Sequence, residues 1–334
     1  MILSCSIKKY DCTMANLAKQ TYSKEVRFYL MGIAMVLVVM FHIAQHQETV
    51  NVVSKSLYYV FANGWVGVDM FFLLSAYGLC HSYNRNNLKT FYRNRFIRIM
   101  PAYPLTLIIG YVVAGTPFIH ACYFFVQQIT GVAIFNRTED VLWYMEALIL
   151  LYLFFPVLFR LCKMMRPIGI GFIILLCIIV HVLMIFIPDY WLQISVQRVP
   201  MMVVGVFTYL YEKDGNKRGL ILIYGSLALM AIMPMVYNMY LFVPAILFLV
   251  ARSECRVFNK TLTFIGKHSF DIFIGHHFAL WIFKYSQWNY YLTLFMALVL
   301  ISIFSSVICY LQKSFQQLTD HCFHRKCIDE GLNT

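Results

Sequence analysis

Residues 64–104 read GWVGVDMFFLLSAYGLCHSYNRNNLKTFYRNRFIRIMPAYP, and this stretch decides how the whole chain is interpreted. It starts with a long apolar segment that carries one acid, Asp69, near its middle. A polar loop follows, and its cations are Arg85, Lys89, Arg93, Arg95 and Arg98. An ionisable group inside a membrane span marks a functional site by default. The stretch therefore predicts a membrane protein that carries out chemistry, and not a simple anchor.

The composition extends this prediction to the whole chain. Of its 334 residues, 61% are hydrophobic and 13% are charged, and the mean hydropathy is +0.69. Soluble domains carry about 25% charged residues, so the composition excludes that class. Because backbone groups in lipid must satisfy one another, the spans are expected to be helices. The predicted fold class is all-α, a polytopic membrane protein in the lipid bilayer.

Apolar runs predict about ten transmembrane helices. They lie at about 28–46, 57–82, 98–115, 141–162, 168–187, 199–211, 218–236, 238–251, 266–285 and 288–310. One further run, 118–135, contains the polar pair Gln127 and Gln128. The cationic loops all face the cytoplasm only if this run does not cross, so we expect a re-entrant or interfacial segment there.

A single membrane domain accounts for the organisation of the chain. We expect an N-terminal segment over 1–27, a membrane domain over 28–310 and a tail over 311–334. The charge bias of the loops predicts that both termini are cytoplasmic. The apolar run after residue 27 is too long for a cleavable signal and lacks a small-residue cleavage site.

Several functional classes are disfavoured by the same sequence. The net charge of +12 arises from short loops between spans, so no nucleic-acid partner is expected. The ten cysteines are scattered, which is typical of reduced thiols. The tail residues His321, Cys322, His324 and Cys327 lack a second pair at zinc-site spacing, so no metal site is expected. No GxSxG, phosphate loop or HExxH motif is present.

Polar residues occur at every expected depth of the membrane. They are His42 and His46 near the outer end of the first span, Asp69, Glu146, Arg198, the pair His276 and His277, and Arg95 with Arg98 at the inner face. Each has an ordinary structural interpretation, such as a helix-end histidine bonded to its neighbour. Together they favour a transmembrane chamber or path. An enzyme and a transporter or flippase for a glycan or lipid precursor both fit this pattern.

A set of segments in fixed order resembles the acyltransferase 3 family of integral-membrane O-acyltransferases. The segments are RFYLMGIAMVLVVMFHI (27–43), GWVGVDMFFLLSAYGL (64–79), FYRNRFIRIMPAY (91–103), LWYMEALILLYLFFP (142–156), RVPMMVVGVFTY (198–209) and HSFDIFIGHH (268–277). Members of that family modify cell-surface polysaccharides and related acceptors. The resemblance therefore implies a polysaccharide or glycan O-acyltransferase, located in the plasma (inner) membrane.

The resemblance also implies roles for individual residues. His42 matches the catalytic histidine of the first helix, and Arg95 with Arg98 matches an Arg-x-x-Arg pair at the start of the third. The acid–aromatic–serine stretch of the family matches Asp69, Phe71, Phe72 and Ser75. Relatives usually have arginine eleven residues before the histidine, where this chain has Met31. Arg27, one turn earlier, is the residue that could replace it.

These matches lead to an expected mechanism. Acyl-CoA, with acetyl-CoA as the default, is the expected donor substrate, and no bound cofactor is expected. Guanidinium groups bind phosphate through paired hydrogen bonds, so Arg95, Arg98 and Arg27 are the expected CoA-binding residues. His42 is expected to take the proton of a carbohydrate hydroxyl, and the sequence leaves open the alternative that it carries the acyl group. Asp69 or Glu146 is expected to fix its tautomer.

Overall fold

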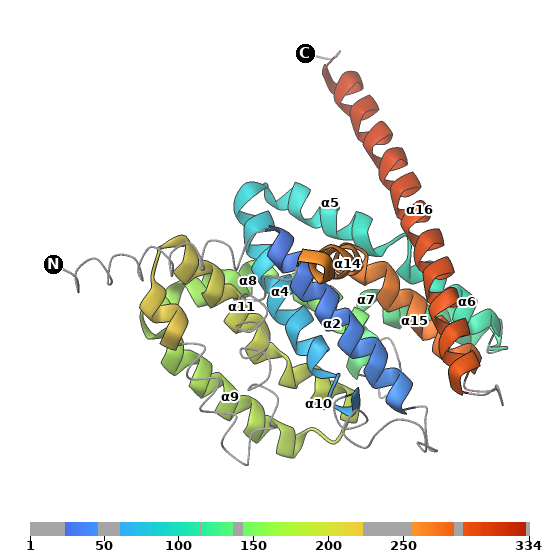
Figure 1. Ribbon diagram of the computed structural model, residues 1–334. Helices are drawn as coiled ribbons and strands as arrows, with labels where there is room; N and C mark the ends of the chain where they lie inside the picture. Colours follow the sequence, from blue (N-terminus) through green and yellow to red (C-terminus); the bar gives the residue numbers. More distant parts are fainter. Residues whose placement is uncertain are drawn as a thin grey trace. The chain divides into compact units, whose positions relative to one another are not determined.

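The computed structural model describes residues 24–45, 61–113, 115–135, 143–222, 256–283 and 290–331. All the regular structure in these ranges is helical (Figure 1), which confirms the expected all-α class. The helices are α2 (Lys24–Gln45), α4 (Val66–Arg85), α5 (Leu88–Ile99), α6 (Tyr103–Val113), α7 (Phe118–Thr130), α8 (Trp143–Met164), α9 (Gly169–Phe186), α10 (Tyr190–Gln197), α11 (Val199–Lys213), α14 (Arg256–Lys267), α15 (Ser269–Phe283) and α16 (Tyr290–Gly331).

Within the described residues, five segments are long and apolar enough to cross a membrane. They are Glu25–His42, Trp143–Met164, Arg166–Phe186, Leu192–Lys213 and Leu298–Thr319. These segments correspond to five of the expected spans, and the membrane character of the chain is supported. The expected number of ten spans is not confirmed. The runs at 218–236 and 238–251 lie almost entirely outside the described residues.

The expected third span, 98–115, is interrupted. Helix α5 ends at Ile99 and α6 begins at Tyr103, with Pro101 between them. Proline lacks the N–H that would continue α5. At 11 residues, α6 is about 16 Å long, against a hydrocarbon core of about 30 Å. The apolar run at 98–115 therefore contains the end of α5 and the whole of α6, and not one continuous span.

The ambiguous run at 118–135 forms α7 and a short 3₁₀ turn, Val132–Phe135. At 13 residues, α7 is about 20 Å long and too short to cross the core. Gly131 ends it with a left-handed backbone, φ 75°. The Tyr103 hydroxyl donates to the Gln128 carbonyl, and the Tyr111 hydroxyl donates to the Gln128 side chain. The helix is too short to span, and its placement as a re-entrant or interfacial segment stays a prediction.

The chain forms two compact units, which we describe separately. The first consists of residues 1–81 and 155–269, and the second of residues 82–154 and 270–334. In the first unit α2 packs against α4 and α14, as Figure 1 shows. A Cβ at Gly32 would meet the backbone of Leu262, because small residues let the two helices approach closely.

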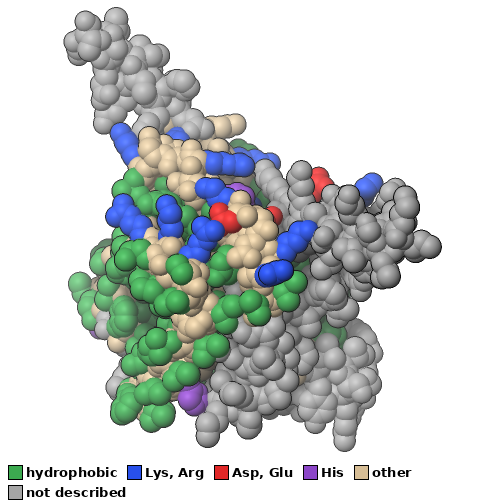
Figure 2. Space-filling model, turned by 90° about the vertical axis from the view of Figure 1, so that its left-hand side faces the viewer, with side chains coloured by type: hydrophobic (Ala, Val, Ile, Leu, Met, Phe, Trp, Pro, Cys, Tyr) green, Lys and Arg blue, Asp and Glu red, His purple; other side chains and the backbone are tan. Residues whose placement is uncertain are grey.

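The membrane-spanning helices leave apolar side chains exposed. On α9, side chains such as Leu175 and Ile178 are more than half exposed. Figure 2 shows Lys and Arg side chains gathered on part of one face, with hydrophobic side chains over much of the remaining described surface. Large exposed apolar surfaces are expected where a protein faces lipid and not water.

In the second unit, α16 runs without interruption from Tyr290 to Gly331. Its 42 residues correspond to about 63 Å, roughly twice the hydrocarbon thickness. The expected span, 288–310, therefore continues as a helix into the region predicted to be a polar tail. The bond from Gln312 Nε2 to the Arg98 carbonyl, 3.2 Å long, ties α16 to the end of α5.

Candidate active site

Asp69 lies in α4 and is fully buried in the first unit. Nη1 of Arg198, at the junction of α10 and α11, lies 3.0 Å from each of its carboxylate oxygens. The guanidinium carbon also lies 5.1 Å from the centroid of the Trp65 ring. Trp65 is one helical turn before Asp69, so the cation is held between an aromatic face and a carboxylate.

The packing of α2 on α4 fixes the depth of Asp69 relative to His42. A Cβ at Gly67 would meet the Ala34 carbonyl, and one at Gly64 would meet the Leu37 carbonyl, so the helices are antiparallel. In this register Asp69 lies at the depth of Gly32, ten residues from His42. Ten residues correspond to about 15 Å along a helix. Asp69 is thus paired with Arg198 and separated in depth from His42.

His42 occupies the last turn of α2 and is half-buried. Its ring centroid lies 5.2 Å from that of Phe41. Partial exposure leaves the imidazole accessible to a ligand, and histidine is a common general base. His46, its expected neighbour on the same face, lies outside the described residues.

Arg27 and Met31 lie one turn apart on α2 but have different environments. The Arg27 side chain is half-buried, and its guanidinium carbon lies 5.3 Å from the Phe28 ring centroid. Met31 is 5% exposed and belongs to the apolar core. The position at which the family resemblance implies an arginine is thus a packed core position in this chain.

In the second unit, Arg95 and Arg98 lie one turn apart on α5 and rest on aromatic side chains. The Arg95 guanidinium carbon is 5.5 Å from the Phe91 centroid and 5.6 Å from that of Tyr152. The Arg98 guanidinium carbon is 5.8 Å from the Phe270 centroid. The Tyr92 hydroxyl donates to the Leu153 carbonyl over 3.0 Å and so fixes α5 on α8.

The electrostatics of this arginine pair favour an anion. Burial lowers the pKa of Arg95 from its ordinary value, Tyr152 opposes this change and the charge of Arg98 adds to it. The Nε atom of Arg95 is buried and makes no hydrogen bond within the described part of the chain. A bound phosphate would relieve the repulsion between the two cations and would accept from their N–H groups.

Glu146 lies in α8 and is 1% exposed. Close to it in sequence, Tyr144 packs on Phe273 with ring centroids 4.8 Å apart, and Phe273 lies 5.3 Å from the His276 ring. Nδ1 of His276 lies 3.3 Å from the Ile272 carbonyl. Since a carbonyl can only accept, Nδ1 would be the donor if this contact is a hydrogen bond.

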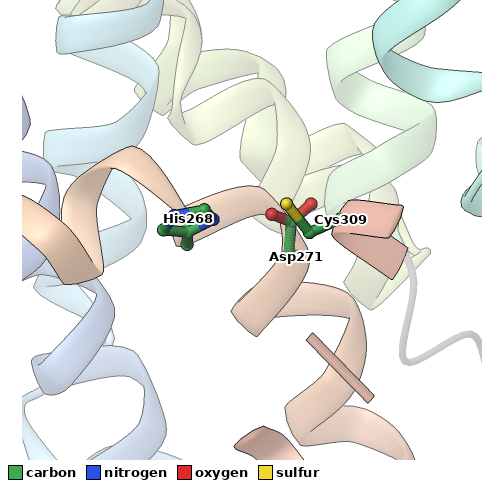
Figure 3. Close-up of side chains that lie close together, drawn as sticks. All are labelled: His268, Asp271 and Cys309. Carbon is green, nitrogen blue, oxygen red and sulfur yellow. The ribbon is translucent and has the colours of Figure 1, made fainter. Parts of the chain in front are cut away.

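A cluster that the sequence did not predict involves Asp271 and Cys309. Their ligand atoms lie within 4.8 Å of each other in the second unit (Figure 3). His268, also drawn there, lies in the turn before α15 and belongs to the first unit. A carboxylate and a thiol alone fall short of the three or four protein ligands of zinc sites. We therefore assign no metal to this cluster.

Sequence reasoning identified the charged residues and missed the aromatic residues beneath them. Trp65 under Arg198 and Tyr152 under Arg95 were not expected as site residues. The spacing of Trp65, one turn before Asp69, was a usable signal. Tyr152 gave none, because its contact with α5 depends on how α5 packs on α8.

Comparison with known proteins identifies the family. The acyltransferase 3 model, described as "Acyltransferase domain", matches residues 29–311. A protein of Acidianus two-tailed virus named "Putative acetyltransferase ORF330" is 22% identical over 275 residues, which cover 69% of this chain and 77% of the viral protein. No solved structure gives a significant match. The chain belongs to the acyltransferase 3 family and is an acyltransferase that transfers groups other than aminoacyl groups.

Proposed function

We propose that this protein is a membrane O-acyltransferase that uses acyl-CoA, with acetyl-CoA as the default donor. The acceptor in this proposal is a hydroxyl group of a cell-surface polysaccharide or glycan precursor. The observation that carries the proposal is the arginine pair of α5, which is held on aromatic rings and has a buried N–H group that makes no hydrogen bond with the described residues. Such a pair suits the phosphates of CoA.

The proposed reaction exchanges one acyl bond for another. The acceptor oxygen attacks the thioester carbonyl, the new C–O bond forms, and the C–S bond to CoA breaks. His42 takes the proton from the hydroxyl, and the leaving thiolate receives a proton and departs as the CoA thiol. General-base catalysis of this kind is typically worth about 10²- to 10⁴-fold in rate.

The two acids that were expected to orient His42 are proposed to have different roles. Asp69 is bound by Arg198, so we propose that it holds α4 to α11 through this ion pair. Glu146, buried in α8, stays a proposed acid of the catalytic site. Arg27, in the first unit, is also proposed as a donor-binding cation.

The proposed location follows from the donor. Acyl-CoA is cytosolic and does not cross a bilayer, so α5 belongs on the cytoplasmic side of the plasma (inner) membrane. The cationic loops support the same orientation, which also places both termini in the cytoplasm. The protein is then a multi-pass enzyme that receives its donor from inside.

Transfer from labelled acetyl-CoA tests this function directly. Membranes with the wild-type protein should incorporate label into a glycan fraction, and membranes with His42→Ala should not. Mass spectra of surface glycans from cells with and without the protein should differ by acetyl groups. Identical spectra, together with no transfer of label in vitro, would reject acetyl transfer to a glycan.

A further inference from the structure

Gly78 of α4 is in direct contact with the side chain of Arg27 of α2, within the first unit. A Cβ built at Gly78 would collide with Nη1 of Arg27, and the three nearest atoms to it all belong to that arginine. The guanidinium therefore lies against the bare backbone of α4. Glycine is less favourable than alanine inside a helix, and at this position it leaves room for the guanidinium.

The helix register explains why Arg27 ends at Gly78. With Gly67 at the depth of Ala34, the backbone of residue 27 lies at the depth of Leu74. Side chains on a helix lean toward its N-terminus, and this lean carries the guanidinium one further turn along α4, to Gly78. An arginine at position 31 with the same lean would end near Leu74, which is 1% exposed.

The neighbouring face of α4 is fixed independently of Arg27. The Tyr77 hydroxyl donates to Glu212 of α11 over 2.5 Å. The His81 ring lies 5.0 Å from the Tyr77 ring and 4.7 Å from that of Tyr209. These contacts hold the C-terminal end of α4 on α11, so the backbone beside Gly78 is a firm support for a side chain.

We propose that Gly78 is a positioning residue for donor binding. Its lack of a side chain forms a seat in which Arg27 presents its guanidinium to a phosphate group of acyl-CoA. This inference rests on the proposed function, in which Arg27 contributes to donor binding. It explains how the chain supplies a first-helix arginine although the family position is Met31.

The test measures the dissociation constant of acetyl-CoA with the full-length protein in nanodiscs. The variants are Gly78→Ala, Arg27→Ala and the double variant, with Gly171→Ala of α9 as the matched control because a Cβ there meets nothing within 4 Å. A lost charge-assisted hydrogen bond corresponds to about tenfold weaker binding. Both single variants should bind about tenfold more weakly than wild type, and the control should bind like wild type.

The double variant separates positioning from a general structural effect. Variants that act through one contact are not additive, so the double variant should bind no more weakly than Arg27→Ala alone. The loss of melting temperature in the double variant should be smaller than the sum of the two single losses, because both substitutions remove the same contact. Fully additive losses would overturn the inference.

The remaining outcomes distinguish this inference from the proposed function. Wild-type binding by Gly78→Ala, with weakened binding by Arg27→Ala, would reject the seat and leave the donor assignment intact. Wild-type binding by both would remove Arg27 from the donor site and also reject the seat. No binding of acetyl-CoA or free CoA by the wild-type protein would reject the proposed donor itself.

Discussion

Asp69 and Arg198 form a buried ion pair that links α4 to the junction of α10 and α11. Nη1 of Arg198 lies 3.0 Å from both oxygens of Asp69, and the Asp69 side chain is fully buried. Removing one member of such a pair costs about 3–5 kcal/mol, because the other charge is left buried alone. Replacing both members by neutral groups costs much less.

Asp69→Asn and Arg198→Gln should each lower the melting temperature and the amount of folded protein in membranes. The double variant should regain most of both, because no uncompensated charge is left. Thermal unfolding of the purified protein gives the melting temperature. Size-exclusion chromatography gives the amount of folded protein. A double variant less stable than either single variant would show that Asp69 and Arg198 do not stabilise the fold through their ion pair.

Local features of the fold could be predicted from the sequence, and long-range pairings could not. The spans α2, α8, α9, α11 and α16 follow from apolar runs, and run length is a property of a single segment. Asp69 and Arg198 were both expected at membrane depth, but they are 129 positions apart. Their pairing depends on how α4 and α11 pack, and no local pattern encodes that.

The same distinction applies to the site. Arg95 and Arg98 were recognisable from their spacing, whereas Tyr152 beneath Arg95 comes from a different helix. Gly78 carries no side chain and so gave no chemical signal, although its contact decides where Arg27 lies. Backbone register was needed to find it.

His42→Ala should reduce acyl transfer by about 10²-fold or more, because it removes the proposed general base. The protein level should be unchanged, because His42 is half-buried at the end of α2 and contributes little to packing. His120→Ala, at an exposed histidine of α7, is the control and should keep wild-type activity. If His42→Ala kept more than about a tenth of the activity, general-base catalysis by this residue would be rejected.

Arg95→Ala and Arg98→Ala should raise the apparent KM for acyl-CoA more than they lower kcat. Arg95→Lys and Arg98→Lys should restore only part of the affinity, because a lysine lacks the planar fork that binds phosphate with two hydrogen bonds. Initial rates in membranes at several donor concentrations give both constants. Arg160→Ala, at an exposed arginine of α8, controls for lost surface charge. An unchanged KM in both alanine variants would show that the pair does not bind the donor and reflects only the charge bias of cytoplasmic loops.

The proposed orientation places α5 in the cytoplasm and the loop at 47–56 outside. Cysteines introduced at Lys89, an exposed residue of α5, and at Asn51, outside the described residues, test this with a membrane-impermeant thiol reagent on intact cells. Native thiols such as the exposed Cys122 are replaced first. Only the cysteine at position 51 should be labelled. The opposite pattern would invert the topology and exclude a cytosolic donor at α5.

Met31→Arg addresses the departure from the family pattern. The family resemblance implies an arginine at this position, so a simple expectation is that restoring it would strengthen donor binding. The structure predicts otherwise. Met31 is 5% exposed, and an arginine there would direct its charge toward buried Leu74 and not toward Gly78. It would also place a like charge one turn from Arg27.

Met31→Arg should therefore lower the amount of folded protein and should not improve donor affinity. In the Arg27→Ala background it should fail to restore acetyl-CoA binding, whereas Arg27→Lys should keep part of it, since a lysine can still reach along α4 to Gly78. The four proteins of the Arg27→Ala and Met31→Arg cycle, with Arg27→Lys as the fifth, are compared by KM for acetyl-CoA and by melting temperature. Full rescue of Arg27→Ala by Met31→Arg would mean that a guanidinium serves from either position, and that the register of α2 on α4 does not decide which arginine the donor meets.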